Sequence, residues 1–337
     1  MQTMHQYLGD LEHLTDESSD GKKSNYVHPA LKNTGCVSLV LIREIIAPAI
    51  FRNAEQEITD IEFDGQSHVR AVANKFKYQE RSRGLQILRA YGVGGRMPQN
   101  RTALKSKQNP SEVFDLNTLI FGDSANQDNR VLPVKAAVNY SDALGLLPYH
   151  LCVEESFHNR AAEDGTLFDP VDKKNSDNLF TRHFVKPGVL LVQVLSCRGR
   201  LLPPEGFAHL LLSIGLAGAY GGQTSITGTN VRTRLAGLYG APFERAETSP
   251  YELTRMLSNT LDQEKLNDPA EVIAAVHAHL QPLHPDSLDS KTISTELENL
   301  VRRFEEEDTA LNQQYQKTAL KVGELFDAWF ENKKKGK

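Results

Sequence analysis

The sequence predicts an α+β protein with an antiparallel sheet core, large insertions and a helical C-terminal region. Runs of β-branched residues and leucine, typical of buried strands, alternate with segments whose apolar residues recur at helical spacing. A polar stretch at residues 150–183 interrupts this alternation, and it is too long for an ordinary loop in a compact domain. After Pro242 the composition becomes helical and charged.

Length and composition restrict the class of protein. A chain of 337 residues can bury a large core, and its formal net charge of −5 is only mildly acidic. The 3 cysteines lie far apart in the sequence, which favours a reducing compartment without disulfides. No apolar run approaches the roughly 20 residues of a membrane span, and the N-terminus does not resemble a signal peptide. We expect a cytoplasmic protein without membrane contact.

The first part of the chain is expected to contain a core strand, a hairpin and a helix. Residues 1–23 are polar and acidic, and we expect a short helix or an arm that packs loosely. The apolar run at 37–46 predicts a buried strand. Two alternating runs around Asp64-Gly65 predict a hairpin, and the apolar spacing over 83–91 predicts a helix.

Two further strands are predicted before the long polar stretch, at 116–123 and 130–140. Pro133 favours a sheet edge for the second, because proline cannot donate a hydrogen bond to a neighbouring strand. In the helical region, Asp268-Pro269 and Ser294 are typical helix starts.

The stretch from 181 to 240 is expected to form a strand, a helix, a glycine-rich loop and a second strand. Residues 189–195 are a buried-strand run, and Pro203-Pro204 open a segment with apolar residues at helical spacing. After the loop, a period-two pattern places Arg232 and Arg234 on one face of a strand.

The glycine-rich loop, GAYGGQTSITG at 218–228, has two interpretations. It is either a plain turn or a loop whose backbone N–H groups approach a phosphate, since glycine has no Cβ to hold a ligand away. No Lys-Ser or Lys-Thr follows the glycines, which excludes a nucleotide P-loop. The helix precedes the glycines, which argues against a dinucleotide fingerprint, and there is no GxSxG hydrolase motif.

Basic residues are concentrated between residues 75 and 107, where Glu80 is the only acid. A local basic cluster in an acidic protein is typical of a polyanion-binding site, and a solvated helix face explains it equally well. The glycines beside Arg96, in YGVGGR, suit contact with a phosphate backbone.

The order of the predicted elements is that of a ferredoxin-like, RNA-recognition-motif-like sheet with large insertions. Four segments are more specific: VSLVLIREIIAPAIFR at 37–52, LIFGDSA at 119–125, VKPGVLLVQVLS at 185–196 and GAYGGQTSITGTNVR at 218–232. With these segments the chain resembles the repeating backbone subunit of CRISPR Cascade complexes. Within the RAMP superfamily it is similar to the Csc-two type of the Cas-seven group, from subtype I-D.

This resemblance implies a non-catalytic subunit that oligomerises along crRNA, binds it independently of sequence and presents the spacer for target pairing in antiviral defence. It implies an N-terminal arm at 1–36, a core at 37–240 and a helical region at 241–337. Within the core, lid or finger insertions are expected at about 53–80 and 92–116, and a thumb at 150–183. The expected partners are crRNA, the target strand, neighbouring copies, the large subunit and the subunit that caps the crRNA 5′ end, without a cofactor.

A subunit that accepts any spacer must hold phosphates and sugars and leave the base edges free for pairing. The expected RNA-binding residues are Arg43, Lys75, Lys77, Arg81, Arg83, Arg96, Arg101, Lys105, Lys173, Lys174, Gly221, Gly222, Gln223, Thr224 and Arg232. For Arg43, an intramolecular ion pair is an equally good explanation.

Two alternatives concern the thumb. Related subunits of type III complexes cut target RNA with a thumb aspartate, and the candidates here are Asp164, Asp169, Asp172 and Asp177. Zinc is the second, through His150, Cys152 and His158 with His183 or an acid as the fourth ligand. Acids in a polar loop usually face solvent, and we expect this of the four aspartates. A paired CxxC is missing, so we expect ordinary histidines and no metal. His277 and His279 are expected on a helix surface.

Overall fold

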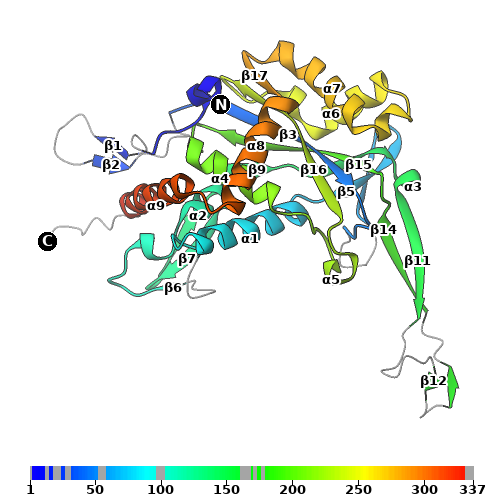
Figure 1. Cartoon of the computed structure of the whole chain (residues 1–337), viewed down its shortest axis with the longest axis horizontal. Helices are drawn as coiled ribbons and strands as arrows, with labels where there is room; N and C mark the ends of the chain where they lie inside the picture. The colour runs from blue at the N-terminus through cyan, green and yellow to red at the C-terminus, as the bar shows by residue number, and fades with distance from the viewer. Residues whose placement is uncertain are drawn as a thin grey trace.

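An eight-stranded antiparallel sheet of order β17-β16-β3-β15-β10-β5-β4, with β9 paired to β15, organises the chain (Figure 1). The computed structural model describes residues 2–11, 15–17, 24–26, 32–51, 58–95, 103–159, 168–169, 173–175 and 179–330. The strands are β3 (Cys36–Ile45), β4 (Asp60–Phe63), β5 (Gln66–Ala71), β9 (Val138–Tyr140), β10 (Ala143–Pro148), β15 (Leu190–Arg198), β16 (Val231–Ala241) and β17 (Asp286–Asp289).

Strand β3 lies between β15 and β16, and it is covered on both faces. Val37, Leu39 and Leu41 belong to one hydrophobic core, whereas Val40 and Ile42 belong to a second core. Successive side chains of a strand point to opposite faces, so β3 needs apolar residues at almost every position. This burial explains the continuous apolar run in the sequence.

Helices form a layer on each side of the sheet (Figure 1). One core contains residues of α1 (Asn74–Ala90), α2 (Leu116–Phe121), α4 (Pro204–Gly215), α8 (Ser290–Glu305) and α9 (Thr309–Trp329). The other contains residues of α6 (Pro250–Thr260) and α7 (Pro269–Leu280). The α+β class, the antiparallel core sheet and the helical C-terminal region are therefore confirmed. No helix of the described segments is long and apolar enough to cross a membrane.

Several predicted elements are confirmed where the local sequence determines the backbone. The hairpin turn lies at Asp64 and Gly65, which have φ angles of 50° and 75°. Helix α4 begins at Pro204, and the Asp268 side chain caps α7 by accepting a hydrogen bond from the Ala270 N–H.

The prediction of a strand at 116–123 is wrong, because residues Leu116–Phe121 form helix α2. Asp115 caps this helix, accepting a hydrogen bond from the backbone N–H of Thr118. Every residue of α2 is buried, so its apolar run has no helical stripe to distinguish it from a strand. The start expected at Ser294 is also wrong, since α8 begins at Ser290 with Asp289 as its cap.

The N-terminal residues pack more tightly than expected. The 3-10 helix η1 (Gln2–Tyr7) places Met4 and Tyr7 in the hydrophobic core beside β3 and β16. A Cβ added at Gly240 of β16 would lie 2.4 Å from Tyr7, so the close approach of these segments requires glycine there. Strands β1 (Thr15–Glu17) and β2 (Ser24–Tyr26) form a separate pair.

The two ranges expected as lid or finger insertions have different structures. Within 53–80, β4 and β5 extend the central sheet and α1 begins, while residues 53–57 lie outside the described residues. Within 92–116, the chain forms η3 (Pro110–Glu112) and β6 (Ala103–Leu104), which joins β7 (Asp123–Gln127) and β8 (Arg130–Val134) in a small sheet. Strand β8 is at the edge of this sheet, as Pro133 predicts.

The range expected as a thumb contains a two-stranded hairpin that extends away from the body (Figure 1). After the short helix α3 (Tyr149–Cys152), β11 (Val153–Asn159) pairs with β14 (Leu179–Val185) from Val153↔Val185 to Asn159↔Leu179. Strands β12 (Phe168–Asp169) and β13 (Lys174–Asn175) pair with each other beyond the hairpin.

Candidate nucleic-acid interface

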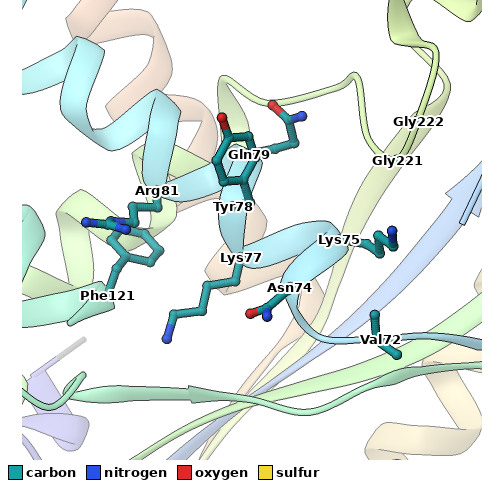
Figure 2. Close-up of a pocket in the computed structure, with 10 residues that line it drawn as sticks. All are labelled: Val72, Asn74, Lys75, Lys77, Tyr78, Gln79, Arg81, Phe121, Gly221 and Gly222. Atoms are coloured by element: carbon teal, nitrogen blue, oxygen red, sulfur yellow. The ribbon is translucent and has the colours of Figure 1, made fainter. Parts of the chain in front are cut away.

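A groove of about 780 Å³ lies between the N-terminal half of α1 and the glycine-rich loop that follows α4 (Figure 2). Lys75, Lys77 and Arg81 of α1 line it together with Gly221 and Gly222 of the loop. Val72, Asn74, Tyr78, Gln79 and Phe121 complete the lining. The groove thus unites the basic segment and the glycine-rich loop, which are distant in the sequence.

Helix α1 presents these cations because its opposite face is anchored in the protein. Its buried residues are Phe76, Glu80, Gly84, Ile87 and Leu88, which recur at three- to four-residue intervals. The basic residues lie between these positions and are partly exposed. The helix therefore fixes its cations along the groove.

Two of the groove cations have no counter-ion among the described residues. Lys75 and Lys77 form no ion pair with any residue that the structure describes, whereas Arg81 Nη2 lies 2.5 Å from Asp123 Oδ2. Partial burial, and then the charge of Arg81, lower the pKa of Lys77. An anion in the groove would relieve this repulsion, so the groove is suited to a negatively charged ligand.

The glycine-rich loop is shaped by a close approach to the segment after β3. Gly221 has a φ of +82°, and a Cβ there would lie 2.5 Å from the carbonyl oxygen of Ile50. The Gly222 N–H donates a hydrogen bond to the same oxygen at 2.8 Å. The Gly222 N–H is therefore engaged within the protein and is not a free donor for a phosphate, while contact of Gly222 with RNA stays a prediction. Glycine is needed here so that the loop can form the groove wall.

Gln223 and Thr224, which are also expected to bind RNA, continue this wall into the short helix α5 (Thr224–Thr227). Gln223 has a left-handed backbone, with a φ of 56°, and both residues are partly exposed. Neither lines the groove.

Arg43 is not at the interface. Its side chain is fully buried, and its Nη1 lies 2.7 Å from Glu80 Oε1. The same nitrogen donates to Thr233 Oγ1, and Nε and Nη2 donate to Gln193 Oε1 at 2.9 and 2.8 Å. The guanidinium also lies 4.5 Å from the centre of the Phe76 ring. The prediction of RNA contact by Arg43 is corrected, and the intramolecular pair is what the structure shows.

Glu80 connects the two walls of the groove. One oxygen of its carboxylate accepts a hydrogen bond from Tyr220 Oη at 2.9 Å, and the other accepts from Tyr140 Oη at 2.6 Å. Tyr220 directly precedes Gly221, and its backbone exchanges two hydrogen bonds with the Asn230 side chain. Burial, and then the charge of Glu80, raise the pKa of Tyr220, so it remains a donor.

The remaining expected residues are dispersed. Arg83 donates to Gln86 of its own helix, and Lys105 is exposed after β6. Arg232 and Arg234 both approach the Glu44 carboxylate, at 3.6 and 2.7 Å. Lys173 is exposed before β13, while Arg96, Arg101 and the Lys174 side chain lie outside the described residues.

Sequence reasoning missed two groove-related residues. Tyr78 lines the groove with 68% of its surface exposed, and Glu80 is completely buried. An aromatic residue within the basic run KFKYQER was a usable signal for Tyr78. The sequence offered no comparable signal for Glu80, because burial of a single acid depends on distant partners.

The zinc alternative can be examined only for its described residues, and these do not form a common site. Cys152 is fully buried and its Sγ donates to the Leu147 carbonyl oxygen at 3.4 Å, whereas His150 is exposed. Burial raises the pKa of the Cys152 thiol to about 11, which disfavours the thiolate that zinc needs. Among the described residues, no group of three or more potential ligands is close enough to hold a metal ion. The side chain of His158 lies outside this description.

The four aspartates of the cleavage alternative cannot be placed. Asp164, Asp172 and Asp177 lie outside the described residues, and for Asp169 only the backbone, in β12, is described. His277, expected on a helix surface, is partly exposed on α7, where its Nδ1 lies 3.1 Å from Tyr239 Oη. His279 is partly exposed on the same helix.

Comparison with known proteins places the fold. Residues 25–321 match the model of the Csc2 Crispr family. The chain is similar to the crystal structure of Thermofilum pendens Csc2, with a TM-score of 0.64 and 17% sequence identity, covering 100% of this chain and 97% of that chain. No curated protein sequence matches.

Weaker matches occur to chains of two structures of a CRISPR RNA-guided surveillance complex. The chain of the pre-nicking complex has a TM-score of 0.47 and 12% identity, covering 75% of this chain and 90% of that chain. The chain of the second complex has a TM-score of 0.42 and 12% identity, covering 73% of this chain and 83% of that chain. Since the family model spans most of the 337 residues, the chain belongs to the Csc2 CRISPR family.

Proposed function

We propose that this chain is a non-catalytic backbone subunit of a CRISPR effector complex. It binds crRNA through the sugar-phosphate backbone, independently of sequence, and presents the spacer for target pairing. The observation that carries this proposal is the groove, in which Lys75 and Lys77 lack a described counter-ion and face the same space as Gly221 and Gly222. Family membership supports the CRISPR context.

The chemistry of the groove fits a ligand that is recognised by charge. Lysine ammonium groups attract phosphates but do not distinguish base sequence, which a subunit that serves any guide requires. Figure 2 shows Lys75 and Lys77 on successive parts of α1, extending in different directions. Two cations separated along one helix suit an extended polyanion better than a single phosphate group.

The proposal extends to the assembly. Copies of the chain stack along the guide in a type I-D Cascade of the RAMP superfamily, beside the large subunit and the subunit that caps the crRNA 5′ end. The β11–β14 hairpin supports the thumb assignment, because it extends away from the body (Figure 1).

The groove is tested by measuring the affinity of the purified protein for single-stranded RNA over a range of salt concentrations. We expect Lys75→Gln/Lys77→Gln to weaken binding and to reduce the slope of log affinity against log salt by about 1.4, since each phosphate contact on a single strand contributes about 0.7. The control is Lys265→Gln/Lys317→Gln, which removes two exposed lysines on η5 (Lys265–Asn267) and α9. Equal affinities and slopes for the wild type and both variants would overturn the groove assignment.

The absence of catalysis is tested separately. The assembled complex is incubated with complementary RNA and magnesium, and the products are separated by length. We expect the target strand to stay intact. Cuts at regular intervals that disappear in an Asp164→Asn/Asp169→Asn/Asp172→Asn/Asp177→Asn variant would establish cleavage by the thumb instead.

A further inference from the structure

Tyr78 is the more exposed of the two aromatic residues that line the groove, since Phe121 is buried. It is 68% exposed, so the face of its ring is accessible to a ligand. Figure 2 shows the ring on α1, between Lys75 and Arg81. Residues three apart on a helix are surface neighbours, so the ring has a cation one turn before it and another one turn after it.

The ring has no hydrogen-bonding or aromatic partner within the described part of the chain. Tyr78 makes no hydrogen bond and no ring contact there, in contrast to Tyr140 and Tyr220, whose hydroxyls both donate to Glu80. The helix beneath Tyr78 is held by the buried side chains of Phe76 and Glu80. The ring is therefore presented on a rigid element, which lowers the entropy lost when a ligand packs against it.

We propose that Tyr78 is a stacking platform for a base of the bound strand, which makes the groove selective for single-stranded over double-stranded nucleic acid. This inference rests on the proposed function and adds the class of ligand. In a duplex the base faces are covered by their neighbours, whereas an unpaired base offers a free face to an aromatic ring. Lys75, which has no counter-ion among the described residues, is placed for a phosphate beside such a base, whereas Arg81 is already paired with Asp123.

Stacking is compatible with a guide that must still pair with its target. The ring contacts the face of the base, and the hydrogen-bonding edge stays free. Every base has such a face, so the contact does not require a particular sequence. Tyr78 thus adds affinity for unpaired strands while the groove remains indifferent to sequence.

The test compares the affinities of Tyr78 variants for three probes of equal length: single-stranded RNA, duplex RNA and an abasic strand. For single-stranded RNA, we expect Tyr78→Ala and Tyr78→Leu to bind roughly 5- to 150-fold more weakly, the range that corresponds to loss of one base stack. Tyr78→Phe should bind within about twofold of the wild type, because stacking needs the ring and not the hydroxyl. The salt slope should not change, and the abasic strand and the duplex should bind equally to all variants.

The control is Phe243→Ala, which removes an aromatic side chain with 54% exposure outside the groove. Thermal unfolding of each variant verifies that the fold is kept. If Lys75→Gln/Lys77→Gln weakens RNA binding but Tyr78→Ala does not, the stacking inference fails and the proposed function stands. If neither change affects RNA binding, both fail. An equal loss on the abasic strand, or a change in oligomeric state without RNA, would show that Tyr78 has another partner.

Discussion

Arg43 and Glu80 form an ion pair with both side chains completely buried, and 2.7 Å separates Arg43 Nη1 from Glu80 Oε1. Burial by itself lowers the pKa of Arg43, but the neighbouring carboxylate more than offsets this, so its pKa is raised. The hydroxyls of Tyr140 and Tyr220 also donate to the Glu80 carboxylate. The pair therefore lies at the centre of a satisfied polar network beneath the groove.

Breaking this pair is expected to destabilise the protein strongly. Glu80→Gln leaves a buried guanidinium without its counter-charge, and Arg43→Met leaves a buried carboxylate, so each should lower the free energy of unfolding by about 3–5 kcal/mol. The double variant should cost less than the sum of the two single variants, because it leaves neither buried charge without its partner. Urea denaturation measures these values. Arg302→Gln is the control, since the Arg302–Glu306 pair is exposed and worth about 0–1 kcal/mol.

Gly221→Ala is expected to damage the groove wall. Its φ of +82° is unfavourable for alanine, and the new Cβ would lie 2.5 Å from the Ile50 carbonyl oxygen, which is backbone and cannot move away freely. We expect a loss of about 1–3 kcal/mol in the free energy of unfolding together with weaker RNA binding. Gly65→Ala separates the two causes: its φ is +75°, but the space around it is open. It should cost about 1 kcal/mol and leave RNA binding intact. Equal effects of the two substitutions would contradict the steric explanation.

His209 should make the stability of the protein depend on pH. It is fully buried between α1, α2 and α9, with Nδ1 3.0 Å from Tyr315 Oη and Nε2 3.3 Å from Asn117 Oδ1. Burial lowers its pKa to about 3, whereas the unfolded chain has the ordinary value of 6.5. The unfolded state therefore binds one more proton between these values. The stabilisation is complete above pH 6.5 and is lost as the pH falls towards 3.

Through His209, the free energy of unfolding should fall by about 1.4 kcal/mol per pH unit between pH 6 and pH 4. Urea denaturation at several pH values measures it, and His209→Asn should remove this part of the slope. His150→Asn, at an exposed position, should leave it unchanged. If the slope of His209→Asn equals that of the wild type, His209 is not the titrating group.

RNA binding should weaken at high pH through Lys77. Its pKa is lowered from the ordinary 10.5 in the free protein, and a bound phosphate favours the charged form. Affinity should therefore begin to fall with rising pH before an ordinary lysine titrates. The affinity is measured at several alkaline pH values with a 2′-O-methyl RNA strand of adenine and cytosine. This strand resists alkaline cleavage, and its bases do not ionise in this range. Lys77→Arg should bind independently of pH over the same interval, because guanidinium stays charged. A decline that persists in Lys77→Arg would assign the titration to another group.

Sequence patterns predicted the elements that depend on neighbouring residues. The apolar run of β3, the Asp64-Gly65 turn and the Asp268 cap are local features, and the structure has each of them. The strand predicted at 116–123 failed because every residue of α2 is buried, which removes the periodicity that separates helix from strand. Boundaries such as that of α8 shifted to the residue that provides a cap.

The candidate site was predicted only in its parts. The basic segment and the glycine-rich loop were each recognisable, but their contact depends on residues 140 positions apart, such as Glu80 and Tyr220. Composition does not tell which charged residue is buried, so the sequence leaves RNA contact and an intramolecular ion pair equally open for Arg43 and indicates no role for Glu80. To place both residues correctly, one must know where Tyr140 and Tyr220 lie, and only the tertiary structure shows this.

The Glu80 carboxylate connects α1, β3, β9 and the glycine-rich loop through three side-chain contacts, with Arg43, Tyr140 and Tyr220, that need no ligand. These contacts fix the two walls of the groove relative to each other before RNA binds. Little backbone entropy should therefore be lost on binding. Encounter should then be governed by long-range attraction between lysines and phosphates, so added salt should slow capture of the strand more than it hastens escape.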